Sequence, residues 1–318
     1  MVMFLQVLPR FDQAWHATCP QNDMRVLFAT DGSKEAAAAL RTSIRLLNAS
    51  DRQIDLLCVA PKPSSAQRHP EQYKRRILRE STQILERARG LVPPETAVNM
   101  RCAIGSPAAV IVQQTEEYDL TVIGPKGTGA KTDNALGPVA SRVIEHARGP
   151  VLVAREVQSE GGLRALIAVD GSDASCRAIE TFRSLFDSTG AEVCLMHVAE
   201  TPWIHLGLGD DWESYDDDEK DRSEAGTLET ELVREGDLII EHARELLRPL
   251  EVQVSVTTRM EEGNPADQIL SEADRGQYDL VVLGATGRRD LKHSMLGSVS
   301  TKIAWNASAS VLIVREPD

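Results

Sequence analysis

The stretch Leu280-Val-Val-Leu-Gly-Ala-Thr-Gly287, followed after nine residues by Gly297-Ser298, decides which fold we expect for this chain. Its first four residues are apolar and partly β-branched, which is typical of a buried parallel strand. The residues from Ser298 onward begin with a capping side chain and continue with helical spacing. Glycines let main-chain amides approach a ligand, and a helix N-terminus offers unpaired N–H donors and a positive dipole end. The stretch therefore predicts a strand–loop–helix unit that binds an anion.

The same loop carries four basic or potentially basic residues, Arg288, Arg289, Lys292 and His293. An ordinary surface loop with solvated charges is the alternative interpretation. Because the glycine spacing, the preceding strand and the following helix agree with one another, we favour the anion site.

A search for internal repeats shows that this unit is the second of two copies. Tyr118-Asp-Leu-Thr-Val-Ile-Gly124 recurs as Tyr278-Asp-Leu-Val-Val-Leu-Gly284. Two shorter motifs recur in the same order, Asp31-Gly-Ser33 as Asp170-Gly-Ser172 and Gly105-Ser-Pro107 as Gly263-Asn-Pro265. Most of the extra length of the second copy lies between its second strand and Gly263.

Each copy alternates short apolar strands with longer helical segments, which is typical of a doubly wound parallel sheet. We therefore expect an α/β protein with two tandem Rossmann-like domains. Each should hold a five-stranded parallel sheet in the order 3-2-1-4-5 with helices on both faces. The expected strands are 25–30, 53–59, 97–103, 119–124 and 150–154, then 163–169, 191–198, 252–259, 279–284 and 310–314. The expected helices are 33–48, 67–91, 107–117 and 138–147, then 173–187, 227–248, 265–275 and 298–306.

The expected domains are residues 24–155 and 163–318, joined by a polar, glycine-ended linker at 156–162. Residues 1–23 have no counterpart in the second copy, and they lack the basic leader and cleavage pattern of a signal peptide. We expect an N-terminal arm that packs on the body. The second copy contains an acidic insertion at about 200–226.

The 318 residues carry a net charge of −13, which argues against nonspecific binding to nucleic acid or to anionic membranes. No apolar run approaches the roughly 20 residues that a membrane-spanning helix needs. The acidic run 210–219 lacks the spacing of a calcium loop, so we favour a solvated insertion over a metal site. The five cysteines form no CxxC pair, which favours a reducing compartment, the cytoplasm, without a zinc site.

Three motifs together resemble the universal stress protein family. They are Asp-Gly-Ser after the first strand, Gly-x-Pro before the third helix, and Gly-x2-Gly-x9-Gly-Ser after the fourth strand. The resemblance covers about residues 24–155 and 163–315, so the chain is similar to a tandem member of that family. It implies a cytoplasmic stress-response protein that binds an adenine nucleotide, most directly ATP, with or without Mg²⁺.

The resemblance also implies which residues of the second copy would contact the nucleotide. Asp170 lines the adenine side, the backbone of Val198 faces the adenine edge, and Gly297 allows close approach of the phosphates. An alternative role for Asp170 is to cap the following helix as part of the Asp-Gly-Ser turn. The complete set is Ala168, Val169, Asp170, Val198, Leu283, Gly284, Gly287, Arg288, Gly297, Ser298, Val299 and Ser300.

The first copy keeps the glycine spacing at Gly124, Gly127 and Gly137 but departs from the motif immediately afterwards. Pro138 stands where the second copy has Ser298, and proline has neither a hydroxyl nor an N–H donor. Ala140 likewise replaces the hydroxyl of Ser300. We therefore expect the first copy to be a degenerate or weaker nucleotide site and the second copy to be the competent one.

Two other functional classes remain open from the sequence. A slow ATP-hydrolysing or group-transferring enzyme is disfavoured because the chain lacks a GxxxxGK[ST] loop, and His293 is the best candidate for proton transfer. A nucleotide-independent interaction scaffold is the other alternative, with no protein partner indicated. The resemblance implies that the fifth strands of the two copies pair within the chain as a pseudo-dimer, and it leaves a further homodimer open.

Overall fold

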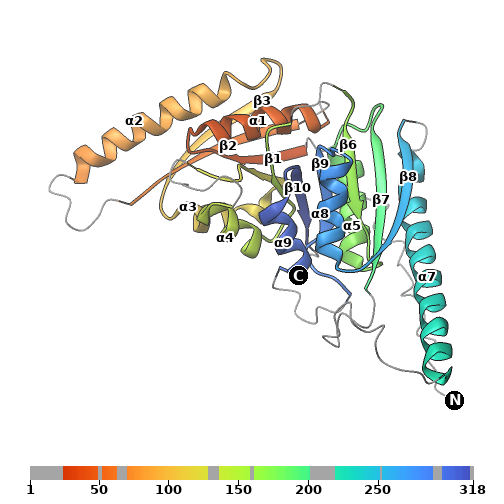
Figure 1. Ribbon diagram of the computed structural model, residues 1–318. Coiled ribbons are helices and arrows are strands. Elements are labelled where there is room, and N and C mark those ends of the chain that lie inside the picture. The colour runs from red at the N-terminus through yellow and green to blue at the C-terminus, as the bar shows by residue number, and fades with distance from the viewer. Residues whose placement is uncertain are drawn as a thin grey trace.

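Two five-stranded parallel sheets join edge to edge in this chain to form one continuous sheet (Figure 1). The computed structural model describes residues 24–48, 52–62, 70–127, 136–157, 161–200, 219–250, 253–288 and 296–315. The strand order across the sheet is β3-β2-β1-β4-β5-β10-β9-β6-β7-β8. Each half therefore has the order 3-2-1-4-5, which confirms the expected fold class.

The strands of the first half are β1 (Met24–Ala29), β2 (Arg52–Ala60), β3 (Ala97–Ile104), β4 (Leu120–Ile123) and β5 (Val151–Val153). Those of the second half are β6 (Arg164–Ala168), β7 (Glu192–Ala199), β8 (Ser255–Glu262), β9 (Leu280–Gly284) and β10 (Ser310–Val314). The central strands are buried on both faces, as β9 illustrates with four fully buried residues before Gly284. Continuous apolar runs are therefore what this sheet requires.

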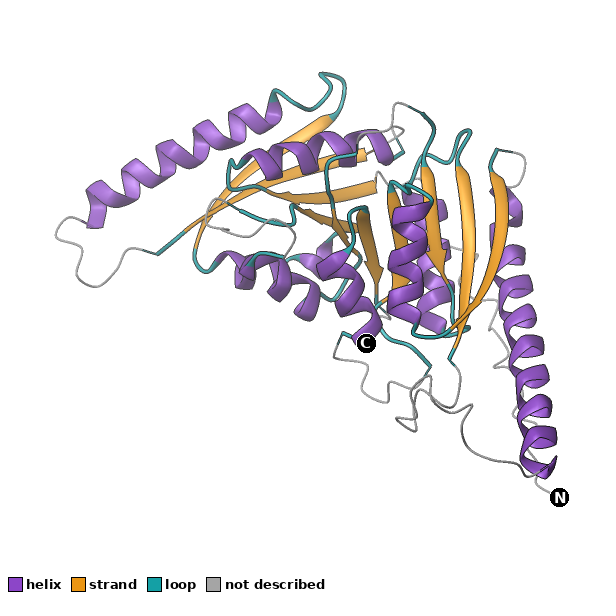
Figure 2. Ribbon diagram, in the orientation of Figure 1, coloured by secondary structure: helices purple, strands orange, loops and turns teal. Residues whose placement is uncertain are grey.

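Helices cover both faces of the sheet (Figure 2). One face packs against α1 (Lys34–Leu46), α2 (Pro70–Arg89), α5 (Asp173–Leu185) and α7 (Glu219–Leu247). The other face packs against α3 (Pro107–Val112), α4 (Pro138–His146), α8 (Pro265–Arg275) and α9 (Ser298–Asn306). Short 3-10 turns follow α3 and α7, at Thr115–Glu117 and Arg248–Leu250. Among the described helices, none has the length and apolar character that crossing a bilayer demands.

The two halves meet through their fifth strands, β5 and β10, which pair antiparallel with Val153 opposite Val311. This pairing confirms the expected pseudo-dimer and leaves neither fifth strand as an open edge. A second, reciprocal contact joins the ends of α1 and α5. Asn48 N–H donates to Leu185 O, and Asp187 N–H donates to Leu46 O, each at 2.9 Å.

Two equivalent arginines, one after β5 and one after β10, form further contacts between the two halves. The Arg155 guanidinium donates to the carbonyl oxygens of Ala304, at 2.7 Å, and Ala309, at 3.2 Å, around the end of α9. Arg315 donates to the carbonyl oxygens of Ile144 and Glu145 near the end of α4. Each half thus satisfies the orphan carbonyls of a helix in the other half. Burial lowers the pKa of Arg155 to about 10.

The structure differs from the sequence-based expectation at a few elements of the fold. Helix α7 begins at Glu219 rather than 227, so the end of the expected acidic insertion is helical. The expected start was based on the apolar stripe, which begins at Leu228. The helix extends toward the N-terminus of that stripe through polar residues, which show no apolar periodicity. Strand β8 lies three residues later than expected, and α3 stops at Val112 before the 3-10 turn. Residues 1–23 and 201–218, with most of the expected arm and insertion, lie outside the described residues.

Candidate functional site

The glycine loop of the second half follows β9 and lies at the carboxyl ends of the parallel strands. Strand β9 pairs with β6 on one side, and β6 pairs with β7 on its other side. The chain therefore leaves β6 and β9 toward opposite faces of the sheet, to α5 and α9. Such a switch point is where open α/β sheets bind ligands.

Packing requires the first glycine of the loop and leaves little room for a side chain at the second. A side chain at Gly284 would place its Cβ 2.8 Å from Ala174 Cβ and 2.9 Å from Ser175 N, at the start of α5. A side chain at Gly287 would place its Cβ 3.0 Å from Asp170 Oδ2. Glycine at 284 is therefore what lets the loop approach the start of α5 this closely.

Asp170 joins that turn to the loop. Its Oδ1 accepts hydrogen bonds from Ser172 N–H at 3.0 Å and Ser172 Oγ at 2.6 Å. Its Oδ2 accepts from Arg288 N–H at 3.3 Å. Gly171 between them has φ +76°, which favours glycine. The turn-capping role is therefore present, and the same carboxylate also fixes the backbone that follows Gly287.

The start of α9 supplies main-chain donors at this edge. Gly297 is the N-cap residue, with φ −64° and ψ 157°, and among the described residues no side-chain hydrogen bond caps the helix. Gly297 N–H donates to Ala285 O at 2.8 Å, which closes the base of the loop. The first intrahelical bond runs from Thr301 N–H to Gly297 O. The amides of residues 298–300 therefore precede the helical ladder and lie at the positive end of the helix dipole.

The two serines of the motif occupy different environments. Ser298 is exposed at the first position of α9. Ser300 is buried, and its Oγ donates to Gly284 O at 2.8 Å. The Ser298 side chain is thus open to solvent, whereas the Ser300 hydroxyl holds the end of β9 against α9.

The apolar candidates separate onto the two faces of the sheet. Ala168, Val198, Leu283 and Val299 pack in one cluster with α8 and α9. Val169 is buried in the other cluster, and its carbonyl oxygen lies 2.8 Å from the ring Nδ1 of His197. The structure therefore places the first four on the α8 and α9 face of the sheet and the side chain of Val169 on the opposite face. His197 is buried and bonded, in keeping with a packing role.

Two participants were missed by sequence reasoning. Glu235, on α7, forms an ion pair with Arg288, and both side chains are about half exposed. Ala285 is buried, and its carbonyl receives the Gly297 amide. No motif signals Glu235, because it lies on a helix far from the loop in sequence. Arg289, Lys292 and His293 lie outside the described residues.

The first half has the same backbone with different chemistry. Gly137 has φ −72° and ψ 162°, and its N–H donates to Pro125 O at 2.8 Å. Asp31 Oδ1 accepts from Ser33 N–H at 3.0 Å, as in the second half. Helix α4 begins at Pro138, so its first position offers no N–H. The loop geometry is duplicated, but the donors at the helix start are not.

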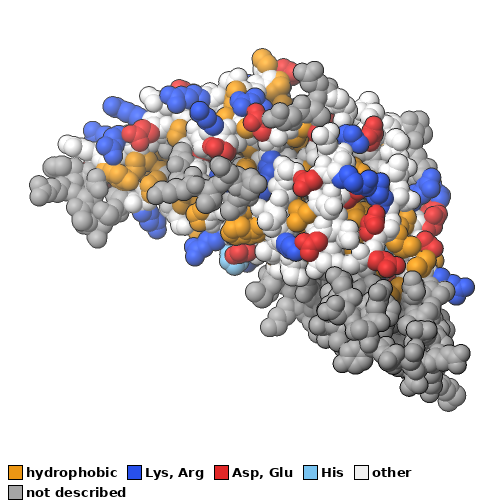
Figure 3. Space-filling view, viewed as in Figure 1, with side chains coloured by type: hydrophobic (Ala, Val, Ile, Leu, Met, Phe, Trp, Pro, Cys, Tyr) orange, Lys and Arg blue, Asp and Glu red, His pale blue; other side chains and the backbone are white. Residues whose placement is uncertain are grey.

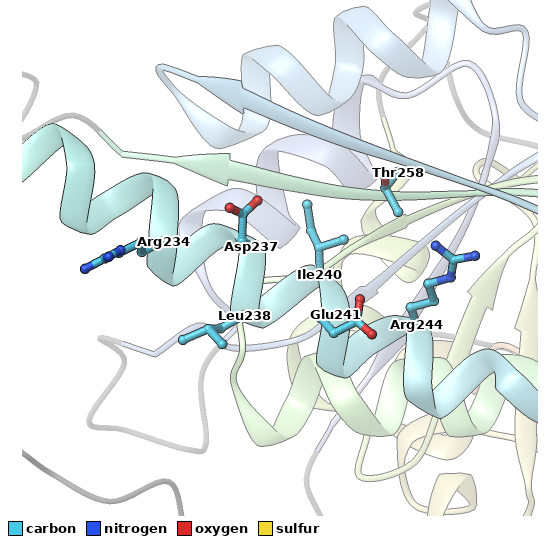
Figure 4. A pocket seen from close by; sticks show the side chains of 7 residues that line it. All are labelled: Arg234, Asp237, Leu238, Ile240, Glu241, Arg244 and Thr258. Carbon is cyan, nitrogen blue, oxygen red and sulfur yellow. The ribbon is translucent and has the colours of Figure 1, made fainter.

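Two surface depressions in the described part of the chain lie away from this edge. One, of about 590 Å³, lies between α7 and β8 (Figure 4). The other, of about 310 Å³, is lined by residues of β8 and α8 that include Arg259 and Glu272. Within the same described ranges, no group of three or more His, Cys, Asp and Glu side chains could hold a metal ion.

Comparison with known proteins agrees with this architecture. The family model described as the universal stress protein family matches residues 24–155 and 163–315. A universal stress protein of Mycolicibacterium smegmatis is 26% identical over 307 residues, which cover 91% of this chain and 96% of that protein.

One solved structure matches nearly the whole chain. The crystal structure of a universal stress protein from Archaeoglobus fulgidus covers 92% of this chain and 98% of its own, with a TM-score of 0.56 at 19% identity, and so shares the fold. A family protein of Arabidopsis thaliana with AMP bound matches 48% of this chain and 92% of its own, with 21% identity and a TM-score of 0.33. Because the family model matches both halves over nearly their whole length, this chain belongs to the universal stress protein family.

Proposed function

We propose that this chain binds ATP at the glycine loop of its second half and acts in the cytoplasm as a nucleotide-dependent sensor or interaction module. The observation that carries the proposal is the uncapped start of α9. Three main-chain amides and the exposed Ser298 hydroxyl converge there, beside a loop that Asp170 holds in place. A helix N-terminus of this kind favours phosphate through its donors and its dipole.

The residues at this edge fit an adenine nucleotide. Ser298, Val299 and Ser300 would supply amides to the phosphates, and Gly297 would allow their close approach. Arg288 would supply positive charge by exchanging Glu235 for a phosphate oxygen, at little net cost because the pair is largely exposed. Ala168 and Leu283 would form the apolar floor beneath the base and ribose. Mg²⁺, if bound, would be carried by the phosphates.

The assignment to the second half follows from the difference between the two helix starts. Pro138 removes one amide and one hydroxyl from the first half without changing the backbone of the loop. The second half therefore offers more hydrogen-bond donors to a phosphate, and ATP would bind there in preference.

A calorimetric titration with ATP tests this function. The backbone at Gly297 is extended, so valine is compatible with it, and the Gly297→Val chain should fold normally. Its isopropyl group would fill the space that the phosphates need, and we expect affinity to fall by about tenfold or more, equivalent to about 1.4 kcal/mol. Gly137→Val is the matched control, because a Cβ there lies 3.4 Å from its nearest neighbour, Lys126 Cα. Identical titration curves for wild type and Gly297→Val would show that the site lies elsewhere.

A further inference from the structure

In the part of the chain that the structure describes, the continuous sheet ends at β3 in the first half and at β8 in the second, and no further described strand pairs with either. Along β3 most side chains are exposed, including Met100 and Arg101. A free edge presents unpaired main-chain groups and is a natural place for another chain to dock. Helices α2 and α7 flank these edges at opposite ends of the molecule (Figure 1).

Exposed apolar side chains gather at the same two ends. Among the described residues, five large hydrophobic side chains are more than a third exposed. Two lie at the first end, Leu78 on α2 and Met100 on β3. Two lie at the second end on α7, Val233 and Leu238, and Leu238 is 68% exposed. Of these five, only Val139 lies elsewhere, so the apolar exposure of the described surface is concentrated at the ends of the sheet.

The two ends carry opposite charge, although α2 and α7 are equivalent helices of a duplicated unit. The α2 segment has six cationic residues and three acidic ones: Lys74, Arg75, Arg76, Arg79, Arg87 and Arg89 against Glu71, Glu80 and Glu86. In residues 231–247, the part of α7 whose side chains are described, acidic residues outnumber arginines by five to two. They are Glu231, Glu235, Asp237, Glu241 and Glu245 against Arg234 and Arg244. Figure 3 shows Lys and Arg gathered toward the α2 end of the molecule.

The shapes of the two ends also differ in a complementary way. The depression between α7 and β8 is lined by Leu238, Ile240 and Thr258, by the carboxylates of Asp237 and Glu241, and by the guanidinium groups of Arg234 and Arg244 (Figure 4). At the other end, Met100 on β3 is the equivalent of Thr258 on β8, because Met100 pairs with Leu56 of β2 and Thr258 pairs with Leu195 of β7. One end therefore presents a large apolar side chain where the other has a small one beside a hollow.

The charged residues of α2 and α7 are spaced alike along the two helices. Arg75, Leu78 and Arg79 are spaced three and four residues apart on α2, so they share one helix face. On α7 the two acidic residues Asp237 and Glu241 are likewise four residues apart, but Leu238 directly follows Asp237, so only the spacing of the charges is shared. Among the described residues, no ion pair engages Arg75, Arg79, Asp237 or Glu241 within the chain.

We propose that a second copy of this chain docks head to tail, with the α2–β3 end of one copy seated in the α7–β8 depression of the next. Leu78 and Met100 cover Leu238 and Ile240, and the arginines of α2 face Asp237 and Glu241. Because the two surfaces differ, the contact is heterologous and repeats from copy to copy, which gives open chains or closed rings. Opposite charges make the association weaken with salt.

Sedimentation velocity of the full chain at rising concentration tests the proposal. Wild type should form larger species at high concentration and low salt. Leu78→Asp and Leu238→Asp should each weaken this association by about tenfold or more, because an aspartate would be buried in an apolar contact. Each variant retains one intact end, so an equimolar mixture of the two should form a dimer and nothing larger. Val139→Asp is the matched control and should assemble like wild type.

The charge contribution is tested separately by Arg79→Glu, which should weaken assembly, and by Arg79→Glu with Glu241→Arg in one chain, which should restore it. Circular dichroism confirms that each variant is folded. A wild type that stays monomeric at every concentration would overturn the proposal, and so would assembly that Leu78→Asp and Leu238→Asp leave unchanged. A chain that assembles only after residues 1–23 are removed would also overturn it, by assigning the depression to that segment.

Discussion

Replacing Ser298 by proline would copy into the second half the residue that the first half carries at Pro138. The substitution removes one amide donor and one hydroxyl at the proposed phosphate site. The backbone accepts it, because the preceding Gly297 is already extended, as a residue before proline must be. Proline is favoured at the first position of a helix, and α4 begins with proline on the same loop geometry.

The expected loss of affinity follows from the two donors. A hydrogen bond to a charged group contributes about 1.5–3 kcal/mol. Loss of both donors from a bound phosphate should therefore cost about 3 kcal/mol or more, which is roughly a hundredfold in Kd. Ser298→Ala removes the hydroxyl alone and should cost about tenfold. The stability of the folded chain should change by less than about 1 kcal/mol, because no intrahelical bond is lost.

Calorimetric ATP titrations of wild type, Ser298→Ala and Ser298→Pro separate these contributions, and thermal unfolding without nucleotide checks the fold. A Ser298→Pro chain that binds as tightly as Ser298→Ala would exclude the amide as a phosphate donor. If all three proteins bind equally, the uncapped start of α9 plays no part in binding and the reasoning fails.

Two further predictions concern stability and thiol chemistry. Arg155→Met should lower the free energy of unfolding by about 2–4 kcal/mol in guanidinium titrations, because two carbonyls around the end of α9 lose a charged donor. Arg315→Met should lower it in the same way, because Arg315 donates to two carbonyls near the end of α4, and equal stability of all three chains would contradict this. Burial raises the pKa of Cys176 to about 11, above its ordinary value of 9.0, so alkylation at mildly alkaline pH should modify exposed Cys102 well before Cys176. Since the folded pKa is the higher one, the stability linked to Cys176 is fully present below about pH 9 and is lost as the pH rises toward 11. Cys176→Ala should lose less stability over that range, and peptide mapping that finds Cys176 modified as fast as Cys102 would be the opposite result.

The elements that could be predicted closely are those with local chemical signals. Helix α8 begins and ends as expected, because Asn264 caps it, Pro265 opens it and Gly276 follows it. Helix α9 likewise begins at the residue after Gly297. The strand order was accessible because a duplicated βαβ pattern allows few topologies.

What escaped prediction depends on contacts between distant segments. No apolar stripe marks the start of α7 at Glu219, so the sequence pattern does not predict it. The ion pair of Glu235 with Arg288 joins two segments that share no sequence motif. The reciprocal capping by Arg155 and Arg315 did leave a signal, since an arginine follows the last strand in both copies. Its meaning becomes clear only once β5 and β10 are known to pair antiparallel.

The two halves also show which parts of the glycine motif can indicate a ligand. A side chain at Gly284 would overlap the start of α5, whereas one at the equivalent Gly124 would lie at an ordinary contact distance of 3.5 Å from Ala36. The second glycine is crowded in both halves, because a side chain at Gly127 or Gly287 would press on the carboxylate of Asp31 or Asp170 whether or not a nucleotide binds. The third glycine is different, because its extended backbone accepts other residues and Gly137 has room for a side chain. A binding site is therefore indicated by the residue after the third glycine, where Ser298 and Pro138 fold alike and differ only in what they can donate.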